Sequence, residues 1–145
     1  MNKFSGVLSP VLTPFTKDLK PDSKRLVKQC RWLLSQNVSL AVFGTTSEAN
    51  SLALEEKISL LDDLVEAGID PAFLMPGTGC CSLPETVHLT SHAVKLGCKG
   101  TLMLPPFIIQ MPLMMDCFEV MLRRLRVLVT VLLKSTCMIY QDLQG

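Results

Sequence analysis

The sequence predicts an α/β fold built on a parallel sheet. Short apolar runs alternate with longer segments in which apolar residues recur every three to four positions. Successive apolar runs lie about thirty residues apart, which is the length of a strand–helix–strand unit. Hydrophobic residues make up 48% of the 145-residue chain and charged residues 19%, a balance that supports one packed core.

Four short apolar runs are the expected strands. Each lacks the alternation of polar and apolar residues that marks a half-exposed sheet, so each resembles a parallel strand buried on both faces. The expected strands are residues 5–12, 40–43, 72–76 and 100–104.

Three helices are expected between these strands. The first runs from Asp22 or Ser23, either of which can cap a helix, to about residue 36. The second follows Ser51 and ends at Gly68, and the third spans about residues 84–97. The inward-facing positions of the first two helices are Leu26, Val27, Cys30, Leu33, Leu34, Ile58, Leu60, Leu61, Leu64 and Val65.

Two architectures share this alternation: an open, doubly wound sheet and a closed barrel of eight strand–helix units. An open sheet fits the length of the chain. A complete barrel needs about 250 residues, so in that architecture the chain supplies only about the first half.

Charge and composition exclude several classes of partner. The net charge of +1 provides no basic surface for nucleic acid or for anionic lipid. The longest apolar run near the C-terminus, residues 127–133, is too short to cross a membrane. The six cysteines contain no C-x-x-C pair, which favours reduced thiols and a cytoplasmic location.

The most informative polar segment reads GTTSEANSL and begins at Gly44. It follows the second expected strand, and parallel α/β proteins place their ligand sites at this end of the strands. Two adjacent hydroxyls, on Thr45 and Thr46, together with backbone N–H groups suit a small carboxylate. The alternative is a loop whose hydroxyls only cap their own backbone.

Other candidate motifs are weaker. His88 and His92 have a zinc-binding spacing, but no third ligand is evident, and an exposed helix face is the simpler interpretation. Cys80 and Cys81 are interpreted as packing residues. Residues 77–79 (GTG) are too short for a dinucleotide fingerprint, so no cofactor is expected.

Four segments in a fixed order resemble one known family over residues 4–107. They are residues 13–15 (TPF), 44–48 (GTTSE), 75–79 (MPGTG) and 104–107 (LPPF), each after an expected strand. Together they are similar to the dihydrodipicolinate synthase / N-acetylneuraminate lyase family of pyruvate-dependent class I aldolases. Ser47 stands where the family usually has glycine.

The resemblance implies a partial (β/α)8 TIM barrel comprising the first four βα units. It implies a lyase that binds pyruvate, forms a Schiff base through a lysine and needs no cofactor, with full-length members forming homo-oligomers. Thr45 would belong to a hydroxyl relay with two tyrosines, and Thr46 would bind the pyruvate carboxylate. The lysine belongs to the sixth strand, beyond Gly145, so this chain is expected to be inactive.

Residues 108–145 depart from the family. They contain five of the eight methionines, and Ile108 stands where the family has tyrosine. Inserting one thymidine before codon 108 permits the reading YYTNATDDGLFRSY for residues 108–121. The same shift gives LYDIP within residues 134–145, close to a family strand. We therefore interpret residues 108–145 as a tail read in a shifted frame. The alternative is a genuine divergent tail in which residues 111–133 form an apolar helix.

A function from another class stays open on this evidence: a small, non-catalytic α/β domain that holds a carboxylate for binding or regulation. A compact monomer that binds pyruvate reversibly would favour it, whereas insolubility would favour an incomplete barrel with open sheet edges.

Overall fold

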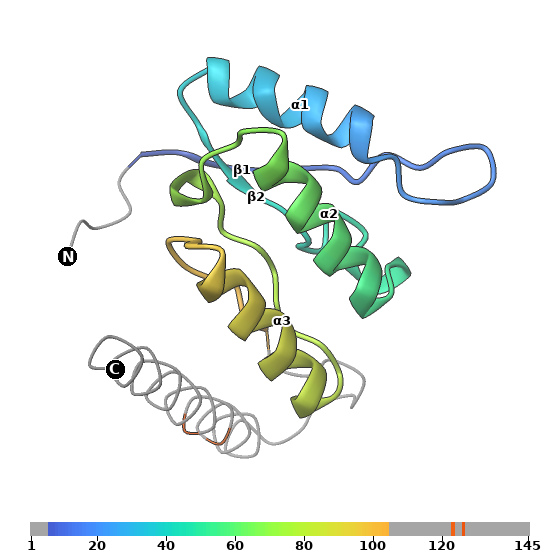
Figure 1. Ribbon diagram of the computed structural model, residues 1–145, viewed down its shortest axis with the longest axis vertical. Helices are drawn as coiled ribbons and strands as arrows, with labels where there is room; N and C mark the ends of the chain where they lie inside the picture. The colour runs from blue at the N-terminus through green and yellow to red at the C-terminus, as the bar shows by residue number, and fades with distance from the viewer. Residues whose placement is uncertain (1–5, 105–122, 124–125, 127–145) are drawn as a thin grey trace, which may run out of the picture.

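A computed structural model of the chain describes residues 6–104 together with Arg123 and Arg126. In chain order the elements are β1 (Leu8–Pro10), α1 (Ser23–Ser35), β2 (Ser39–Ala41), the 3-10 helix η1 (Ala49–Ser51), α2 (Leu54–Glu66), the 3-10 helix η2 (Pro71–Phe73) and α3 (Leu83–Lys95). Strands and helices alternate through β1, α1, β2 and α2, as the sequence predicts, whereas no full strand stands between α2 and α3 (Figure 1).

The strands form a parallel layer. β1 pairs with β2 in parallel, with Leu8 opposite Ser39. Two single parallel bridges extend this order, from Leu40 to Leu74 and from Gly77 to Leu102. The four expected strand positions therefore lie side by side in parallel, which confirms the predicted fold class, although the third and fourth contribute single bridges.

The third strand begins later than predicted. Residues 71–73 form η2 because Pro71 stands at its first turn and the Asp70 side chain accepts a hydrogen bond from the Ala72 N–H, with an Oδ1–N distance of 2.9 Å. An Asp followed by Pro is a common start signal for a helical turn. Leu74 is then the first residue to pair with β2.

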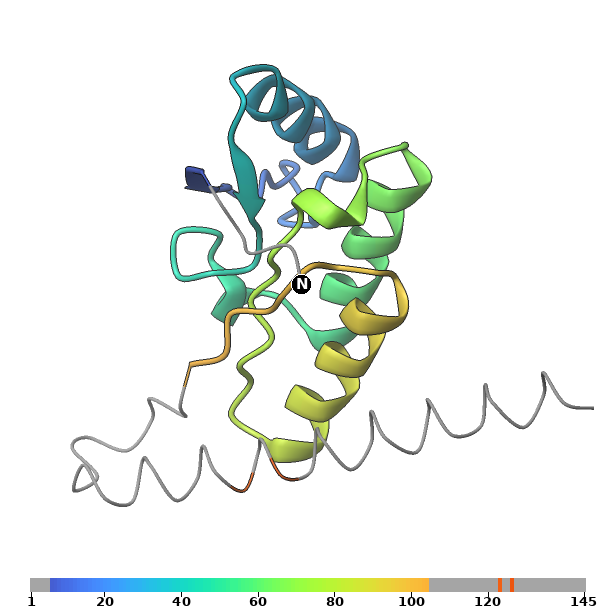
Figure 2. The ribbon, with the colours of Figure 1, turned by 90° about the vertical axis from the view of Figure 1, so that its left-hand side faces the viewer.

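All three helices lie on one side of the strand layer (Figure 2). Leucines from α1, α2 and the strands fill the space between the layers, and burying each one stabilises the fold by about 1.5–3 kcal/mol. The most buried members of this core are Val11, Leu26, Cys30, Leu40, Val42, Leu61, Leu64, Leu74 and Ala93. Val27, Leu33, Leu34 and Val65 pack against it while partly exposed.

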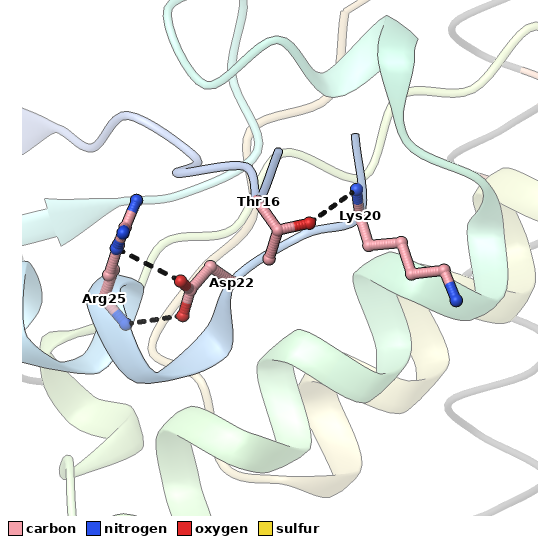
Figure 3. Close-up of polar contacts among 4 residues, drawn as sticks. All are labelled: Thr16, Lys20, Asp22 and Arg25. Atoms are coloured by element: carbon pink, nitrogen blue, oxygen red, sulfur yellow. Dashed lines mark hydrogen bonds and ion pairs between the residues drawn. The ribbon is translucent and has the colours of Figure 1, made fainter. Parts of the chain in front are cut away.

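The start of α1 confirms the predicted cap. Asp22 Oδ1 accepts a hydrogen bond from the Arg25 N–H at 3.0 Å, and Asp22 Oδ2 lies 3.2 Å from Arg25 Nε (Figure 3). The loop before it closes on itself, because Thr16 Oγ1 accepts a hydrogen bond from the Lys20 N–H at 3.2 Å. Asp22 thus fixes where the loop ends and the helix begins.

Helix α2 differs from the sequence prediction in two ways. It begins at Leu54, after η1, rather than directly after Ser51, and the Glu56 carboxylate accepts a hydrogen bond from the Ala53 N–H at 2.9 Å. In addition, Lys57 is buried, with 6% of its surface exposed, whereas the apolar Ile58 beside it is only partly buried. The aliphatic part of a lysine side chain can pack against apolar surface in this way.

Residues 108–122, 124–125 and 127–145 lie outside the described part of the chain. The proposed boundary at residue 107 and the shifted frame therefore remain predictions. Within the described residues, no helix combines the length and apolar character that a membrane span requires.

Candidate functional site

The candidate site is built around the turn that follows β2. After Ala41 the chain continues through the buried residues Val42 and Phe43, and Phe43 has a φ of +59°. A bulky residue in this left-handed region costs about 1–3 kcal/mol, and such strain is concentrated at functional sites. The left-handed residue redirects the chain out of the strand layer at this point, so the next residues form a turn.

The turn closes on itself through its backbone. The Gly44 carbonyl accepts hydrogen bonds from the N–H groups of Ser47 at 3.1 Å and Ala49 at 3.3 Å. The Thr45 carbonyl accepts one from the Glu48 N–H at 3.1 Å. In Figure 2 this turn lies on the side of the strands away from the helices. The carbonyls of the turn are therefore used internally.

Thr45 and Thr46, the predicted site residues, are both exposed at this turn. Within the described residues, neither threonine donates or accepts a hydrogen bond through its amide N–H or its hydroxyl. Two adjacent N–H groups and two hydroxyls are therefore available to a ligand. The alternative interpretation, a loop whose hydroxyls cap its own backbone, describes Ser47, whose hydroxyl accepts a hydrogen bond from the Gly44 N–H, but not the two threonines.

Ser47 behaves differently from the two threonines. It is 1% exposed, and its hydroxyl accepts a hydrogen bond from the Gly44 N–H at 3.2 Å. The same hydroxyl donates to the carbonyl of Val11, just beyond the end of β1. The sequence shows Ser47 as a departure from the family's usual glycine, but its contact with β1 depends on tertiary structure.

Two glycines after the third strand position allow segments to approach closely. A Cβ atom on Gly77 would lie 2.0 Å from the carbonyl oxygen of Phe43. A Cβ atom on Gly79 would lie 2.8 Å from the backbone nitrogen of Leu104. Glycines two apart on an extended segment lie on one face and signal such an approach. This signal is present in the sequence, in the same segment that is too short for a dinucleotide fingerprint.

These segments enclose a cavity of about 470 Å³ at the carboxyl ends of the strands. Its lining residues are Phe43, Gly44, Thr45, Ala49, Asn50, Gly77, Gly79, Leu102 and Leu104. Thr45 thus belongs to the cavity wall, whereas Thr46 lies next to it in sequence without lining it. Sequence reasoning identified the threonines and missed Asn50.

The wall is mostly apolar, with a few polar groups at one side, as is usual for small-molecule sites. None of the nine lining residues within the described part of the chain carries a charge, so N–H groups and hydroxyls are the groups that these residues offer to an anion. A second cavity of about 320 Å³ shares Ala49, Asn50 and Gly79 and is also lined by the buried Lys57. Lys57 therefore lines this second cavity and not the cavity beside Thr45.

The histidines and cysteines lie elsewhere. His88 is exposed, and His92 Nε2 lies 2.7 Å from Asp62 Oδ1, a contact that joins α3 to α2. No group of three potential metal ligands occurs among the residues with described positions. Cys81 is exposed, so its interpretation as a packing residue is wrong, because it stands on the loop before α3.

Burial changes the pKa of two thiols, that of Cys30 in the core and that of Cys98, which is partly buried against it. It raises the pKa of Cys30 to about 12 and that of Cys98 to about 11. A raised pKa keeps a thiol protonated at neutral pH, which makes it a poor nucleophile. These two cysteines therefore act as apolar packing residues.

Sequence comparison identifies relatives of this chain. The model of the dihydrodipicolinate synthetase family matches residues 3–116. A 4-hydroxy-tetrahydrodipicolinate synthase of Methanococcoides burtonii is 36% identical over 105 residues, which is 72% of this chain and 35% of the relative. A DapA-like lyase of Chloroflexus aurantiacus is 35% identical over 109 residues, 74% of this chain and 36% of the relative. The chain spans about a third of the length of these relatives.

Solved structures share the fold. Dihydrodipicolinate synthase from Agrobacterium tumefaciens has a TM-score of 0.81 at 24% identity, covering 85% of this chain and 43% of its own. N-acetylneuraminate lyase from Proteus mirabilis has a TM-score of 0.71 at 28% identity, covering 82% of this chain and 41% of its own. Dihydrodipicolinate synthase from Acinetobacter baumannii, solved with pyruvate, has a TM-score of 0.71 at 26% identity, covering 83% and 42%.

The described fold superposes on these structures over most of the chain. The family model covers well over half of the chain. The chain belongs to the dihydrodipicolinate synthetase family.

Proposed function

We propose that this chain is the N-terminal part of a lyase that acts on pyruvate through a lysine Schiff base. The observation that supports the proposal is the pair of exposed threonines with unpartnered N–H groups and hydroxyls, at the edge of a cavity at the carboxyl ends of parallel strands. A pyruvate complex is known for a relative at 26% identity. The roles follow the family: Thr46 binds the carboxylate, and Thr45 relays a proton.

The carboxylate end of pyruvate fits this turn for a physical reason. A carboxylate accepts several hydrogen bonds, and N–H groups that already project from a fixed turn lose little entropy on binding it. The apolar wall formed by Leu102 and Leu104 suits the methyl end of the ligand. Thr46 lies outside the cavity lining, so its contact requires pyruvate to bind at the rim.

A nucleophile is missing from this arrangement. Among the described residues no lysine lines the cavity beside Thr45, and the buried Lys57 lines the neighbouring cavity. Trapping a Schiff base needs a deprotonated amine at the keto carbon. We therefore propose that the 145-residue chain performs no catalysis. Reversible binding of pyruvate by a compact monomer would favour the second candidate function, a small non-catalytic α/β domain that holds a carboxylate, over an incomplete barrel.

The binding test uses ligand-observed NMR with pyruvate and the 145-residue chain. Thr46→Val should weaken binding by about tenfold, because it removes a hydrogen bond to a charged group. Ser51→Ala is the matched control, since this exposed hydroxyl lies outside both cavities, and it should leave binding unchanged. Equal binding by Thr46→Val and the unmodified chain would overturn the assigned role of Thr46.

The trapping test adds pyruvate and borohydride and examines the product by mass spectrometry. We expect no stoichiometric adduct on any lysine. If one forms, Lys57→Arg shows whether the buried lysine is responsible. A single modified lysine would overturn the proposal that the chain lacks a nucleophile.

We also propose that residues 108–145 result from a shifted reading frame. The support is the reading obtained after insertion of one thymidine, which places tyrosines directly after Phe107. The test is the nucleotide sequence across codons 105–110 and downstream of codon 145. In the frame obtained by inserting one nucleotide before codon 108, an uninterrupted family motif is expected, and stop codons throughout that frame would refute the shift.

A further inference from the structure

The hydroxyl of Ser47 joins the ends of two neighbouring strands. It accepts a hydrogen bond from the N–H of Gly44, the first residue of the turn after β2, and donates one to the carbonyl of Val11, just after β1. The Val11 N–H is itself bonded to the Ala41 carbonyl at 3.0 Å. The serine thus adds one side-chain link beyond the last backbone link between the strands.

The need for this link arises from Phe43. Because Phe43 adopts a left-handed conformation, the Gly44 N–H no longer points along the strand ladder. A buried N–H without a partner is costly, and so is a buried carbonyl. One hydroxyl can satisfy both groups, since it donates one hydrogen bond and accepts others.

The two hydrogen bonds of the Ser47 hydroxyl also fix the position of the turn. Gly44 and Ser47 are its first and fourth residues, and the two threonines lie between them. Ser47 is 1% exposed and held by two hydrogen bonds, whereas both threonines are exposed. The buried serine is therefore the fixed point from which the two threonines project.

We propose that Ser47 is a positioning residue that orients the N–H groups of Thr45 and Thr46 toward the carboxylate of a 2-oxo acid. Its role in ligand binding rests on the proposed function, because the ligand assigned to the threonines is pyruvate. The orientation of the turn does not depend on the ligand. The two parts of the proposal can therefore be tested separately.

The first test measures amide hydrogen exchange in the unmodified 145-residue chain by NMR, without ligand. The Gly44 N–H should exchange slowly, because it is bonded to the buried hydroxyl, while the Thr45 and Thr46 N–H groups should exchange quickly. If Gly44 exchanges as fast as Thr45, the hydroxyl does not hold this N–H and the proposal is wrong. This result does not depend on any variant folding correctly.

The second test compares Ser47→Ala with Thr90→Val. Thr90 is also a buried hydroxyl, 5% exposed, whose Oγ1 donates to the Thr86 carbonyl at 2.7 Å on α3, away from the turn. Ser47→Ala should shift the amide resonances of Thr45 and Thr46 and weaken pyruvate binding by about tenfold. Thr90→Val should do neither.

The outcomes separate the two proposals. If the unmodified chain does not bind pyruvate, the proposed function fails. Shifted amide resonances of Thr45 and Thr46 in Ser47→Ala, without such shifts in Thr90→Val, would still support the positioning role of Ser47. If Ser47→Ala binds pyruvate normally, or if Thr90→Val weakens binding equally, the positioning role is overturned. If Ser47→Ala does not fold, the exchange rate of the Gly44 N–H in the unmodified chain decides.

Discussion

Two segments meet at the carboxyl ends of the strands, and they contribute in opposite ways. The turn after β2, residues 43–49, supplies polar groups: two exposed threonines and a buried serine whose hydroxyl has two partners. The segment after the third strand position, residues 76–79, supplies space, because its two glycines lack side chains that would strike neighbouring backbone. A binding site in this fold therefore needs polar groups from the turn after one strand and residues without side chains in the segment after the next strand.

The two segments also differ in the hydrogen bonding of their buried hydroxyl groups. Ser47 donates and accepts one hydrogen bond each. Thr78 is fully buried between the two glycines, and its hydroxyl is one of two buried side-chain polar atoms without a partner in the described part of the chain. A satisfied hydroxyl stabilises the fold, whereas an unsatisfied one destabilises it.

The largest effect is expected for Gly77→Ala. The added Cβ would lie 2.0 Å from the Phe43 carbonyl oxygen and 2.7 Å from its carbonyl carbon, both of them backbone atoms with little room to move. We expect a loss of about 3 kcal/mol or more in the free energy of unfolding. Chemical denaturation measures it. Gly44→Ala is the matched control, because no atom lies within 4 Å of its added Cβ. Equal losses of unfolding free energy in both variants would refute the role assigned to the close approach between Gly77 and the Phe43 backbone.

Gly79→Ala should have a smaller effect of about 1–2 kcal/mol. Its added Cβ would lie 2.8 Å from the Leu104 nitrogen, and the Leu104 side chain is 55% exposed, so this neighbour can shift at less cost than the buried Phe43. Denaturation of both glycine variants in one buffer tests the order. A larger loss for Gly79→Ala than for Gly77→Ala would reverse our ranking of the two contacts.

Thr78→Val should stabilise the fold by about 1 kcal/mol. Valine has nearly the same shape and removes a buried hydroxyl that has no partner. Thermal unfolding compared with Thr90→Val provides the control, because the Thr90 hydroxyl is bonded and its loss should destabilise. Destabilisation by Thr78→Val would show that its hydroxyl has a partner in solution, such as a buried water.

The smallest effect on stability is expected for the double variant Thr45→Val, Thr46→Val. Both side chains are exposed, and neither hydroxyl has a partner among the described residues. We expect a change below about 0.5 kcal/mol. Circular dichroism during denaturation measures it. A loss approaching that of Gly77→Ala would mean that the threonines support the fold and are not reserved for a ligand.

Much of the fold follows from local sequence signals. Helix α1 begins where Asp22 predicts it, since a capping side chain acts on N–H groups only a few residues away. The start of α2 was misplaced because Ser51 belongs to η1 rather than to a cap. The burial of Lys57 could not be predicted from periodicity, because it depends on the cavity formed with the segment that contains Cys80.

The candidate site was only partly predictable. Thr45 and Thr46 could be identified from adjacent hydroxyls after a strand, a pattern contained in nine residues. The partner of Ser47 lies 36 residues away along the chain, at Val11, so no local pattern reveals it. The left-handed conformation of Phe43 was also hidden, because phenylalanine gives no sequence signal for a conformation that glycine usually adopts.

The contact between Gly77 and Phe43 has a consequence for how this sequence can change. Because the Phe43 carbonyl occupies the space where a side chain at position 77 would begin, the two positions cannot vary independently. A larger residue at 77 requires the backbone at 43 to leave its left-handed conformation, which would move the threonines two and three residues later. A change of ligand through a substitution at position 77 therefore requires changes in both strands. Recombination that exchanges only one of the two strands would separate the residues at positions 43 and 77, which fit each other.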